Sequence, residues 1–129
     1  MLLARDFPGT RLIINHTGMP SDRSAAGLAG WRQAMQQIAH CPNVAVKISG
    51  IGLAGRRWSA AANRQVVRGT IELFGRDRCM FDSNFSVDSL CSSFKDIFNG
   101  FASIVADISS TEWRQLFHDN ALRLYDIGR

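Results

Sequence analysis

The amino-acid sequence predicts an α/β domain built from parallel β/α units. Short apolar runs rich in β-branched residues alternate along the chain with longer segments whose apolar side chains recur every three or four residues. Nearly wholly apolar strands separated by helices are typical of a parallel sheet that helices cover. The chain has 129 residues, of which 46% are hydrophobic and 20% are charged, so a single domain spanning residues 1–129 is expected.

The first unit begins with residues 12–14, an apolar run bounded by glycine and proline that predicts a buried strand. A helix is expected next, because apolar residues recur there at spacings of three and four. Its apolar positions are Leu28, Trp31, Met35 and Ile38. Pro42 then ends the helix.

The second unit consists of a strand over residues 44–49, a flexible glycine-containing loop and a helix over residues 60–75. Ser59 is placed to cap this helix, and Gly75 stands where a left-handed residue often ends one. The loop glycines do not form a phosphate-binding motif, because their spacing differs from GxGxxG and no Walker lysine follows.

The third unit starts with a short strand over residues 79–81, followed by a polar loop over residues 82–86. A long helix with a wide apolar core face is predicted next, with Asp88 as its N-cap. The apolar positions are Leu90, Phe94, Ile97, Phe98, Phe101, Ile104 and Val105. Ser109 and Glu112 have capping-box spacing, so a last helical stretch is expected to run to Tyr125.

Composition excludes several classes of protein. No run approaches the roughly 18 apolar residues of a membrane-spanning helix, and Arg5 and Asp6 interrupt the apolar start before a signal-peptide core forms. Three cysteines without C-x-x-C spacing indicate neither a disulfide framework nor a thiolate zinc site. The net charge of +4 comes from scattered arginines, which gives no nucleic-acid motif. A cytoplasmic protein that binds neither membrane nor nucleic acid is expected.

Polar side chains follow each predicted strand and are expected to converge, since ligands bind beyond the carboxyl ends of parallel strands. His16 follows the first strand. In one interpretation its imidazole polarises a substrate carbonyl or shuttles a proton; in the other, it only forms hydrogen bonds within the loop. Arg23 either meets an anionic substrate or is solvated. Lys47 should point to the opposite side of the sheet from its neighbours. His40 and His118 lie on helices and are expected to be structural.

Four segments together resemble the C-terminal part of the amidohydrolase-2 family, which comprises TIM-barrel hydrolases, lactonases and decarboxylases. The segments are Asn-His-Thr-Gly-Met-Pro at 15–20, Val-Ala-Val-Lys-Ile-Ser-Gly at 44–50, Arg-Cys-Met-Phe-Asp-Ser-Asn-Phe-Ser-Val-Asp at 78–88 and Asn-Ala-Leu-Arg-Leu-Tyr at 120–125. The resemblance covers almost the whole chain in order. It implies that the three strands are the last three of a (β/α)8 barrel, followed by C-terminal helices.

The resemblance implies hydrolysis of a lactone, amide or related carbonyl bond in a small molecule. His16 and Asn84 are then the candidate catalytic residues, and Arg23, Lys47 and Ser83 the candidate substrate-binding residues. The family's usual metal-site aspartate is replaced here by Asn84, which cannot take a proton but can orient water or a carbonyl. Asp82 stands where the family has a small residue, and Ser86 where it has proline.

The resemblance also implies a divalent metal such as zinc in the complete family fold. The His-x-His pair and the further histidine that usually bind it have no counterpart in this chain, so metal ligands here are unknown and the chain alone supports no cofactor. A TIM barrel needs about 250 residues, and three parallel strands leave two open edges. We therefore expect a missing N-terminal half or a homo-oligomer, and inactivity of the chain alone.

The alternative interpretation is a non-catalytic truncated remnant or a self-associating interaction module, whose exposed strand edge pairs with another copy or another half-barrel. A small basic nucleic-acid binder is a third interpretation, which no motif supports.

Overall fold

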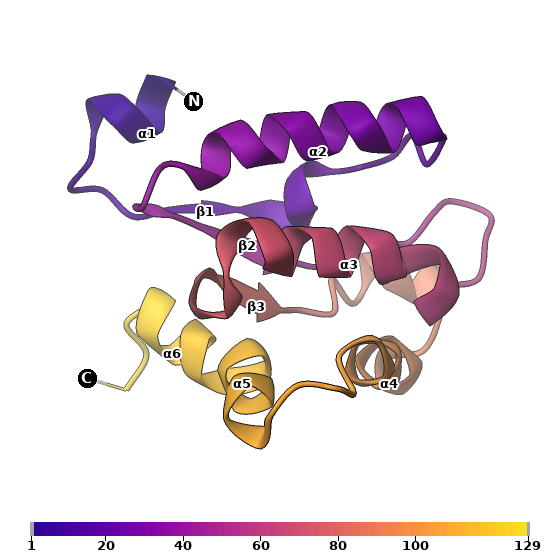
Figure 1. The fold of residues 1–129 in the computed structure, drawn as a ribbon. Helices are drawn as coiled ribbons and strands as arrows, with labels where there is room; N and C mark the ends of the chain where they lie inside the picture. The colour runs from indigo at the N-terminus through magenta and orange to yellow at the C-terminus, as the bar shows by residue number, and fades with distance from the viewer. Residues whose placement is uncertain (1, 129) are drawn as a thin grey trace.

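The computed structural model describes residues 2–128 and contains one parallel sheet of three strands in the order β1-β2-β3. The strands are β1 (Leu12–Ile14), β2 (Val44–Ile48) and β3 (Cys79–Phe81). Leu12 lies opposite Val44 across the first pair of strands, and Val46 lies opposite Cys79 across the second. The strands end on the same side, on the right in Figure 1, and both chain termini lie on the other side. The predicted α/β class, with parallel β/α units, is confirmed.

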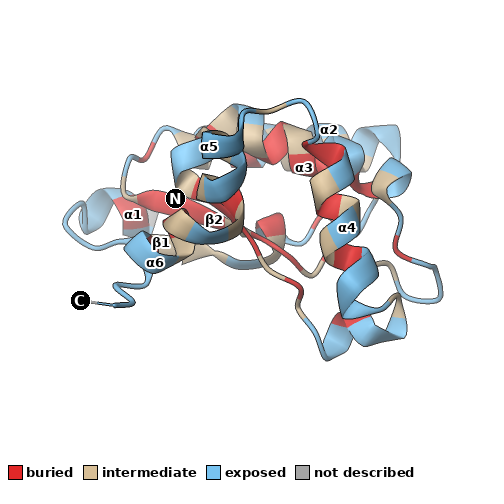
Figure 2. Ribbon diagram, turned by 90° about the horizontal axis from the view of Figure 1, so that it is seen from below, coloured by how far each residue is buried: buried red, intermediate tan, exposed pale blue. Residues whose placement is uncertain are grey.

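Helices α2 (Ala25–Ala39) and α3 (Ala60–Phe74) connect the strands and cover one face of the sheet (Figure 1). The main core lies between this face and the two helices, where burial of apolar surface stabilises the fold. Its contributors from the central strand and helices include Met35, Val44, Val46, Ile48, Val66, Val67 and Phe74. Figure 2 shows the same division, with a largely buried β2, an intermediate β1 and exposed outer helix faces.

The opposite face of the sheet carries the alternate side chains of β2 and has a smaller apolar cluster. Ala45, Met80 and Leu124 form this cluster, and Leu124 comes from helix α6 (Asn120–Leu124). The cluster lies toward the amino ends of the strands, where Ala45 and Leu124 also line one surface pocket. Toward the carboxyl ends, this face carries Lys47, as the alternation of strand side chains predicts.

Three serines cap helices as their side-chain chemistry favours. Ser24, Ser59 and Ser93 each accept a hydrogen bond from the third residue of the helix that follows, at donor–acceptor distances of 3.1, 3.2 and 3.1 Å. Gly75 ends α3 at a φ of 80°, so the predicted start and end of this helix are both confirmed to within one residue.

The predicted start of the third long helix is wrong. Helix α4 spans Phe94–Ile104, because Ser93 rather than Asp88 provides the N-cap. Leu90 lies in a short 3-10 turn, η3 (Val87–Leu90), and is 88% exposed, so it is not part of the core. Phe94 at the first turn of α4 is also exposed, and the buried stripe begins at Ile97.

The C-terminal stretch forms almost continuous helix. The predicted capping box is confirmed, since the Glu112 backbone N–H donates to Ser109 Oγ at 3.3 Å and the Ser109 N–H donates to Glu112 Oε2 at 2.9 Å. Hydrogen bonds from the Ser109 backbone and side chain lower the pKa of Glu112. Helix α5 (Ser110–Arg114) passes through one π-helical turn, η4 (Gln115–Asp119), into α6.

A short first helix, α1 (Leu2–Asp6), precedes β1 and was not expected from the sequence. The buried side chain of Ala4 joins it to the main core. Asn43 fixes the following turn, since its Nδ2 donates to the carbonyls of Ala4, Phe7 and Thr10 at 2.9 to 3.1 Å. No helix within residues 2–128 is long and apolar enough to span a bilayer.

Arg78 joins the ends of both crossover helices to the sheet. Its guanidinium donates to the carbonyls of Ala39, Cys41, Val44 and Phe74 at 2.9 to 3.2 Å. Ala39 and Phe74 are the last residues of α2 and α3, where carbonyls lack partners within the helix and a positive charge is favoured. One side chain therefore satisfies backbone groups of both β/α units.

We predict that Arg78→Met lowers the free energy of unfolding by about 3 kcal/mol or more, because four partly buried carbonyls lose a charged donor. Arg78→Lys should recover only part of this, since an ammonium group cannot reach four separated carbonyls. Urea denaturation followed by circular dichroism measures both. Arg57→Met, an exposed control, should change the value by less than about 0.5 kcal/mol. Equal stability of the Arg78→Met variant and the control would contradict this role.

Candidate functional site

The carboxyl ends of the three strands bring polar side chains together in pairs. His16, after β1, has its Nδ1 atom 3.0 Å from Oγ of Ser49, which follows β2. Lys47 on β2 has its Nζ atom 3.3 Å from Oδ2 of Asp82, which follows β3. The backbone N–H of Asp82 also donates to the Ile48 carbonyl at 3.1 Å. Each loop is therefore held by its neighbour in the sheet.

A left-handed turn follows β1 and contains His16. His16, Thr17 and Met19 have φ values of 56°, 51° and 55°, and Gly18 between them has a φ of 69°. Left-handed backbone costs an L-residue about 1–2 kcal/mol, so three such non-glycine residues in four positions store strain. Strain of this kind clusters at functional sites.

Buried hydrogen bonds hold the strained turn in place. Thr17 is fully buried, and its hydroxyl donates to the His16 carbonyl at 2.6 Å. Trp31 on α2 donates from its indole nitrogen to the Thr17 carbonyl at 2.7 Å, and the Met19 N–H donates to the His16 carbonyl at 2.8 Å. The core helix thus fixes the conformation from which the His16 side chain emerges.

The His16 ring lies directly against the β2 loop. A Cβ atom built on Gly50 would lie 2.4 Å from His16 Nδ1, far inside van der Waals contact. Gly50 also has a φ of 56°, so both its space and its backbone require glycine. Ser49 is fully buried, and its hydroxyl can either accept from Nδ1–H or donate to Nδ1. Ser49 and Gly50 together define the orientation of the imidazole.

Lys47 and Asp82 form an ion pair on the face of the sheet away from α2 and α3. Their side chains are 23% and 39% exposed, so both charges are partly withdrawn from water. A partly buried pair interacts more strongly than a surface pair because less water screens it. The pair places one ammonium and one carboxylate at the end of β2 and β3.

Asn84 is held through a buried carboxylate. It has a φ of 51°, and its Nδ2 donates to Asp88 Oδ1 at 3.0 Å. The other oxygen of Asp88, Oδ2, accepts from the Gly52 N–H at 3.4 Å. Asp88 is 5% exposed and links the β2 loop to the β3 loop, which the sequence-based assignment as N-cap missed. Ser83 is also buried, and its Oγ accepts from the Phe85 N–H at 3.1 Å.

Arg23 is half-buried rather than fully solvated. Its Nη2 donates to the Ile51 carbonyl at 3.0 Å, whereas Nε and Nη1 are buried without a partner in the described part of the chain. Burial lowers the pKa of this guanidinium. Burying polar groups without hydrogen bonds costs free energy. The Nε and Nη1 atoms of Arg23 therefore destabilise the chain unless an acceptor reaches them.

A pocket of about 680 Å³ lies between the loops that follow β1 and β2. Its size falls within the roughly 300–1,000 Å³ of small-molecule sites. Two arginines and one aspartate contribute charge to it. The lining residues are Met19, Pro20, Ser21, Asp22, Arg23, Ser24, Gly50, Gly52, Leu53, Ala54 and Arg56. Hydrogen bonds from Ser24, the backbone one foremost, lower the pKa of Asp22, which keeps this carboxylate ionised.

Residues 2–128 contain no group of three or more His, Cys, Asp or Glu side chains placed to hold a metal ion. The structure thus adds no metal ligand to the set that the sequence left unknown. His118 is exposed and lies with Nδ1 2.8 Å from Asp119 Oδ1, and His40 is exposed at the end of α2. Burial raises the pKa of the Cys79 thiol to about 12, so this cysteine is not a thiolate.

Sequence reasoning identified His16, Lys47 and Asn84 by their places after or within strands, and the structure positions each of them at the carboxyl ends. It overlooked Asp88 as a loop anchor and Gly50 as the contact of the His16 ring. The sequence signal for Gly50 was its place as a glycine directly after the strand predicted over residues 44–49.

The family model described as "Amidohydrolase" matches residues 3–127 of the chain. The chain is 47% identical over 125 residues to the uncharacterized protein y4mH of Sinorhizobium fredii, covering 97% of this chain and 42% of that protein. It is 30% identical over 131 residues to an L-fucono-1,5-lactonase of Burkholderia multivorans, covering 90% and 43%. The chain thus spans less than half the length of these relatives.

The fold superposes on the crystal structure of an amidohydrolase from Burkholderia multivorans with bound HEPES, at a TM-score of 0.83 and 25% identity. The match covers 97% of this chain and 47% of that one. A second crystal form with bound zinc gives the same TM-score and coverage at 24% identity. The whole of this chain therefore corresponds to about half of a larger amidohydrolase fold.

We predict that Gly50→Ala displaces the His16 ring, because the new methyl group overlaps Nδ1. The ring resonances of His16 should shift in NMR spectra, and the protein should lose about 1–3 kcal/mol of stability. Gly55→Ala is the matched control, since Gly55 has a φ of 71° but nothing within 4 Å of the added Cβ. If both variants leave the His16 resonances equally unchanged, the proposed contact is wrong.

Proposed function

The chain belongs to the amidohydrolase family, and we propose that it supplies half of a hydrolytic active site that opens a lactone or related carbonyl compound. The remaining groups come from a complementary β/α half, corresponding to the part of the relatives that this chain does not cover. The observation that carries the proposal is the His16 ring, which a strained turn holds against Ser49 and Gly50 at the carboxyl ends of the strands.

His16 is proposed to move the proton in hydrolysis. With Nδ1–H donating to Ser49 Oγ, the Nε2 atom carries a lone pair and can take a proton from water. The oxygen of that water bonds to the substrate carbonyl carbon, the ring C–O bond breaks, and Nε2 returns the proton to the leaving alkoxide oxygen. The product is one open chain with an alcohol and a carboxylic acid, and the acid releases its proton to solvent as it becomes a carboxylate.

Lys47 and Asn84 are proposed to act on the carbonyl and the water. The Lys47 ammonium favours negative charge on the carbonyl oxygen as water adds, and Asp82 holds that ammonium in position. Asn84 uses one amide hydrogen on Asp88, which leaves its second hydrogen and its oxygen to orient water or substrate. Asp88 therefore acts as a positioning residue.

The pocket between the β1 and β2 loops is proposed to bind the rest of the substrate. Its volume of about 680 Å³ exceeds the needs of a sugar lactone, the substrate class named in the lactonase relatives. Arg23 and Arg56 favour hydroxyl or carboxylate oxygens on that substrate, and Ser83 supports the loop beside it.

A zinc-bound structure stands among the similar folds, yet the described residues of this chain do not form a metal site. The donor set at the carboxyl ends includes one imidazole, one amide, the Asp82 carboxylate paired with Lys47, and the buried Asp88 carboxylate, which already accepts from Asn84 and the Gly52 N–H. Such a set does not fit a divalent cation by itself. The steps proposed above are those of the chain's own residues.

We predict that hydrolysis of L-fucono-1,5-lactone appears when the chain is combined with the part of the Sinorhizobium relative that it does not match. A pH-indicator assay measures the acid released. His16→Asn should lower the rate by about 100-fold or more, as expected for loss of a general base.

His118→Asn provides the control, because His118 is exposed and distant in the chain from the strand ends. Its rate should equal that of the unmodified chain. A stable complex with no lactone hydrolysis would refute the catalytic role while keeping the half-barrel interpretation. Full activity of the His16→Asn complex would refute the role of His16.

A second candidate function is self-association without catalysis. An exposed apolar surface supports it, formed by Phe85, Val87, Leu90 and Phe94 around η3 and the start of α4. Phe85 and Phe94 lie edge to face with centroids 5.8 Å apart, so the rings before η3 and at the start of α4 are in contact. Contiguous exposed apolar patches mark interaction sites. The outer strands β1 and β3 each pair with β2 alone in the described sheet.

Sedimentation velocity separates the two candidates. The first predicts a monomer that assembles with the complementary half, whereas the second predicts a stable dimer of this chain alone. If the second holds, Leu90→Glu should dissociate the dimer, because it puts a charge on the most exposed apolar residue. Leu3→Glu on α1, also exposed, is the control and should leave the dimer intact.

A further inference from the structure

A second pocket lies at the amino ends of the strands, at the opposite end of the sheet from the proposed hydrolytic site. Its volume is about 230 Å³. Three of its lining residues are arginines and none is acidic. The full set is Pro8, Gly9, Arg11, Pro42, Asn43, Val44, Ala45, Arg78, Arg123 and Leu124. Three arginines and no acidic residue line this small pocket, which favours a positive potential there.

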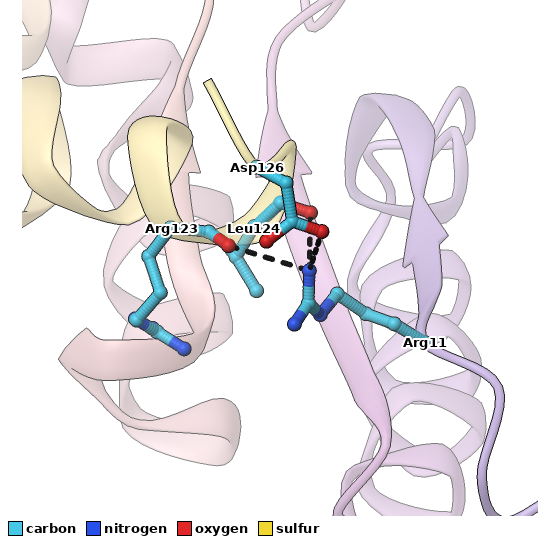
Figure 3. A network of polar contacts seen from close by, with 4 residues as sticks. All are labelled: Arg11, Arg123, Leu124 and Asp126. Carbon is cyan, nitrogen blue, oxygen red and sulfur yellow. Dashed lines mark hydrogen bonds and ion pairs between the residues drawn. The ribbon is translucent and has the colours of Figure 1, made fainter. Parts of the chain in front are cut away.

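Backbone carbonyls hold these arginines in place. Arg11 Nη1 donates to the Leu124 carbonyl at 2.8 Å and to the Arg123 carbonyl at 3.3 Å (Figure 3). Arg123 Nη2 donates to the Asp77 carbonyl and to Asn120 Oδ1. Arg78 is held by four carbonyls, as described above. Neutral acceptors thus orient all three side chains, and Arg11 alone among them also contacts a carboxylate in the described chain, that of Asp126.

Much of the donor capacity of two of these arginines remains unused. Within residues 2–128, the side-chain hydrogen bonds of Arg11 involve only Nη1 and those of Arg123 involve only Nη2. The nearest carboxylate contact is Asp126 Oδ2, 3.4 Å from Arg11 Nη1, and both side chains are about half exposed. No carboxylate in the described chain pairs with Arg78 or Arg123. An exposed pair of this kind contributes little.

We propose that this pocket binds a small oxyanion of the size of inorganic phosphate. Guanidinium groups match the geometry of phosphate oxygens, and charge-assisted hydrogen bonds to them are about twice as strong as neutral ones. A pocket of about 230 Å³ lies below the roughly 300–1,000 Å³ of sites for larger ligands, so it suits a free anion rather than a nucleotide. The bound anion would tie β1, the turn before β2 and α6 together.

Isothermal titration of the full chain with sodium phosphate tests the proposal, with sodium chloride at equal ionic strength as the reference. We expect saturable phosphate binding and none with chloride. Arg11→Met and Arg123→Met should each weaken phosphate binding by about tenfold or more, through lost charge-assisted hydrogen bonds. Arg57→Met, an exposed arginine outside the pocket, is the control and should bind phosphate normally.

The variants Arg11→Lys and Arg123→Lys keep the net charge of the chain. Circular dichroism verifies that all variants are folded, so that weaker binding is not mistaken for unfolding. Their affinities should lie between those of the unmodified chain and the methionine variants, because an ammonium lacks the guanidinium's planar donors. Absence of saturable binding to the unmodified chain would overturn the proposal. Equal weakening by Arg57→Met would also overturn it, since binding would then reflect net charge. Neither result bears on lactone hydrolysis.

Discussion

The fold depends on how the guanidinium of Arg78 meets the ends of two helices. In a parallel β/α unit the carbonyls at the C-terminus of each crossover helix need donors just where the next strand begins. Arg78 provides them for Ala39 at the end of α2 and for Phe74 at the end of α3, and also bonds to Val44 at the start of β2. One rigid group therefore serves both units close to the starts of β2 and β3. Ile48 pairs with Phe81, so β2 and β3 end at the same level, and polar side chains gather beyond that point.

The two ends of the sheet have opposite physical characters. At the amino ends, arginines and Asn43 satisfy backbone carbonyls. At the carboxyl ends, His16 and Asn84 occupy left-handed backbone. Strained conformations persist only where surrounding contacts over-determine them, and the buried Thr17 and Asp88 supply those contacts. Stability at one end thus allows a defined but costly geometry at the other.

The sequence predicts those parts of the fold that depend on local chemistry. Strand runs, apolar periodicity and serine caps act over a few residues, so β1 to β3, α2 and α3 were placed correctly. Leu90 was misplaced because its apolar spacing matches the stripe on α4, whereas Ser93 competes successfully as the cap and starts the helix later. The clearance between Gly50 and the His16 ring involves residues 34 positions apart. No local pattern reports such a contact, which is why the detail of the site required the structure.

The exposure of one face of the sheet determines how strongly water screens the charges of Lys47 and Asp82. Helices α2 and α3 bury one face, but the face that carries Lys47 and Asp82 is covered by α6 only toward the amino ends. A charge pair open to water is screened, and a hydrogen bond from such a site stabilises a developing oxyanion less than one in a water-excluded site. Closing this face would strengthen the Lys47 field at the substrate without moving any residue of the chain. In the proposed assembly, the complementary half would exclude water as well as supply side chains, while contacts within this chain already orient His16 and Asn84.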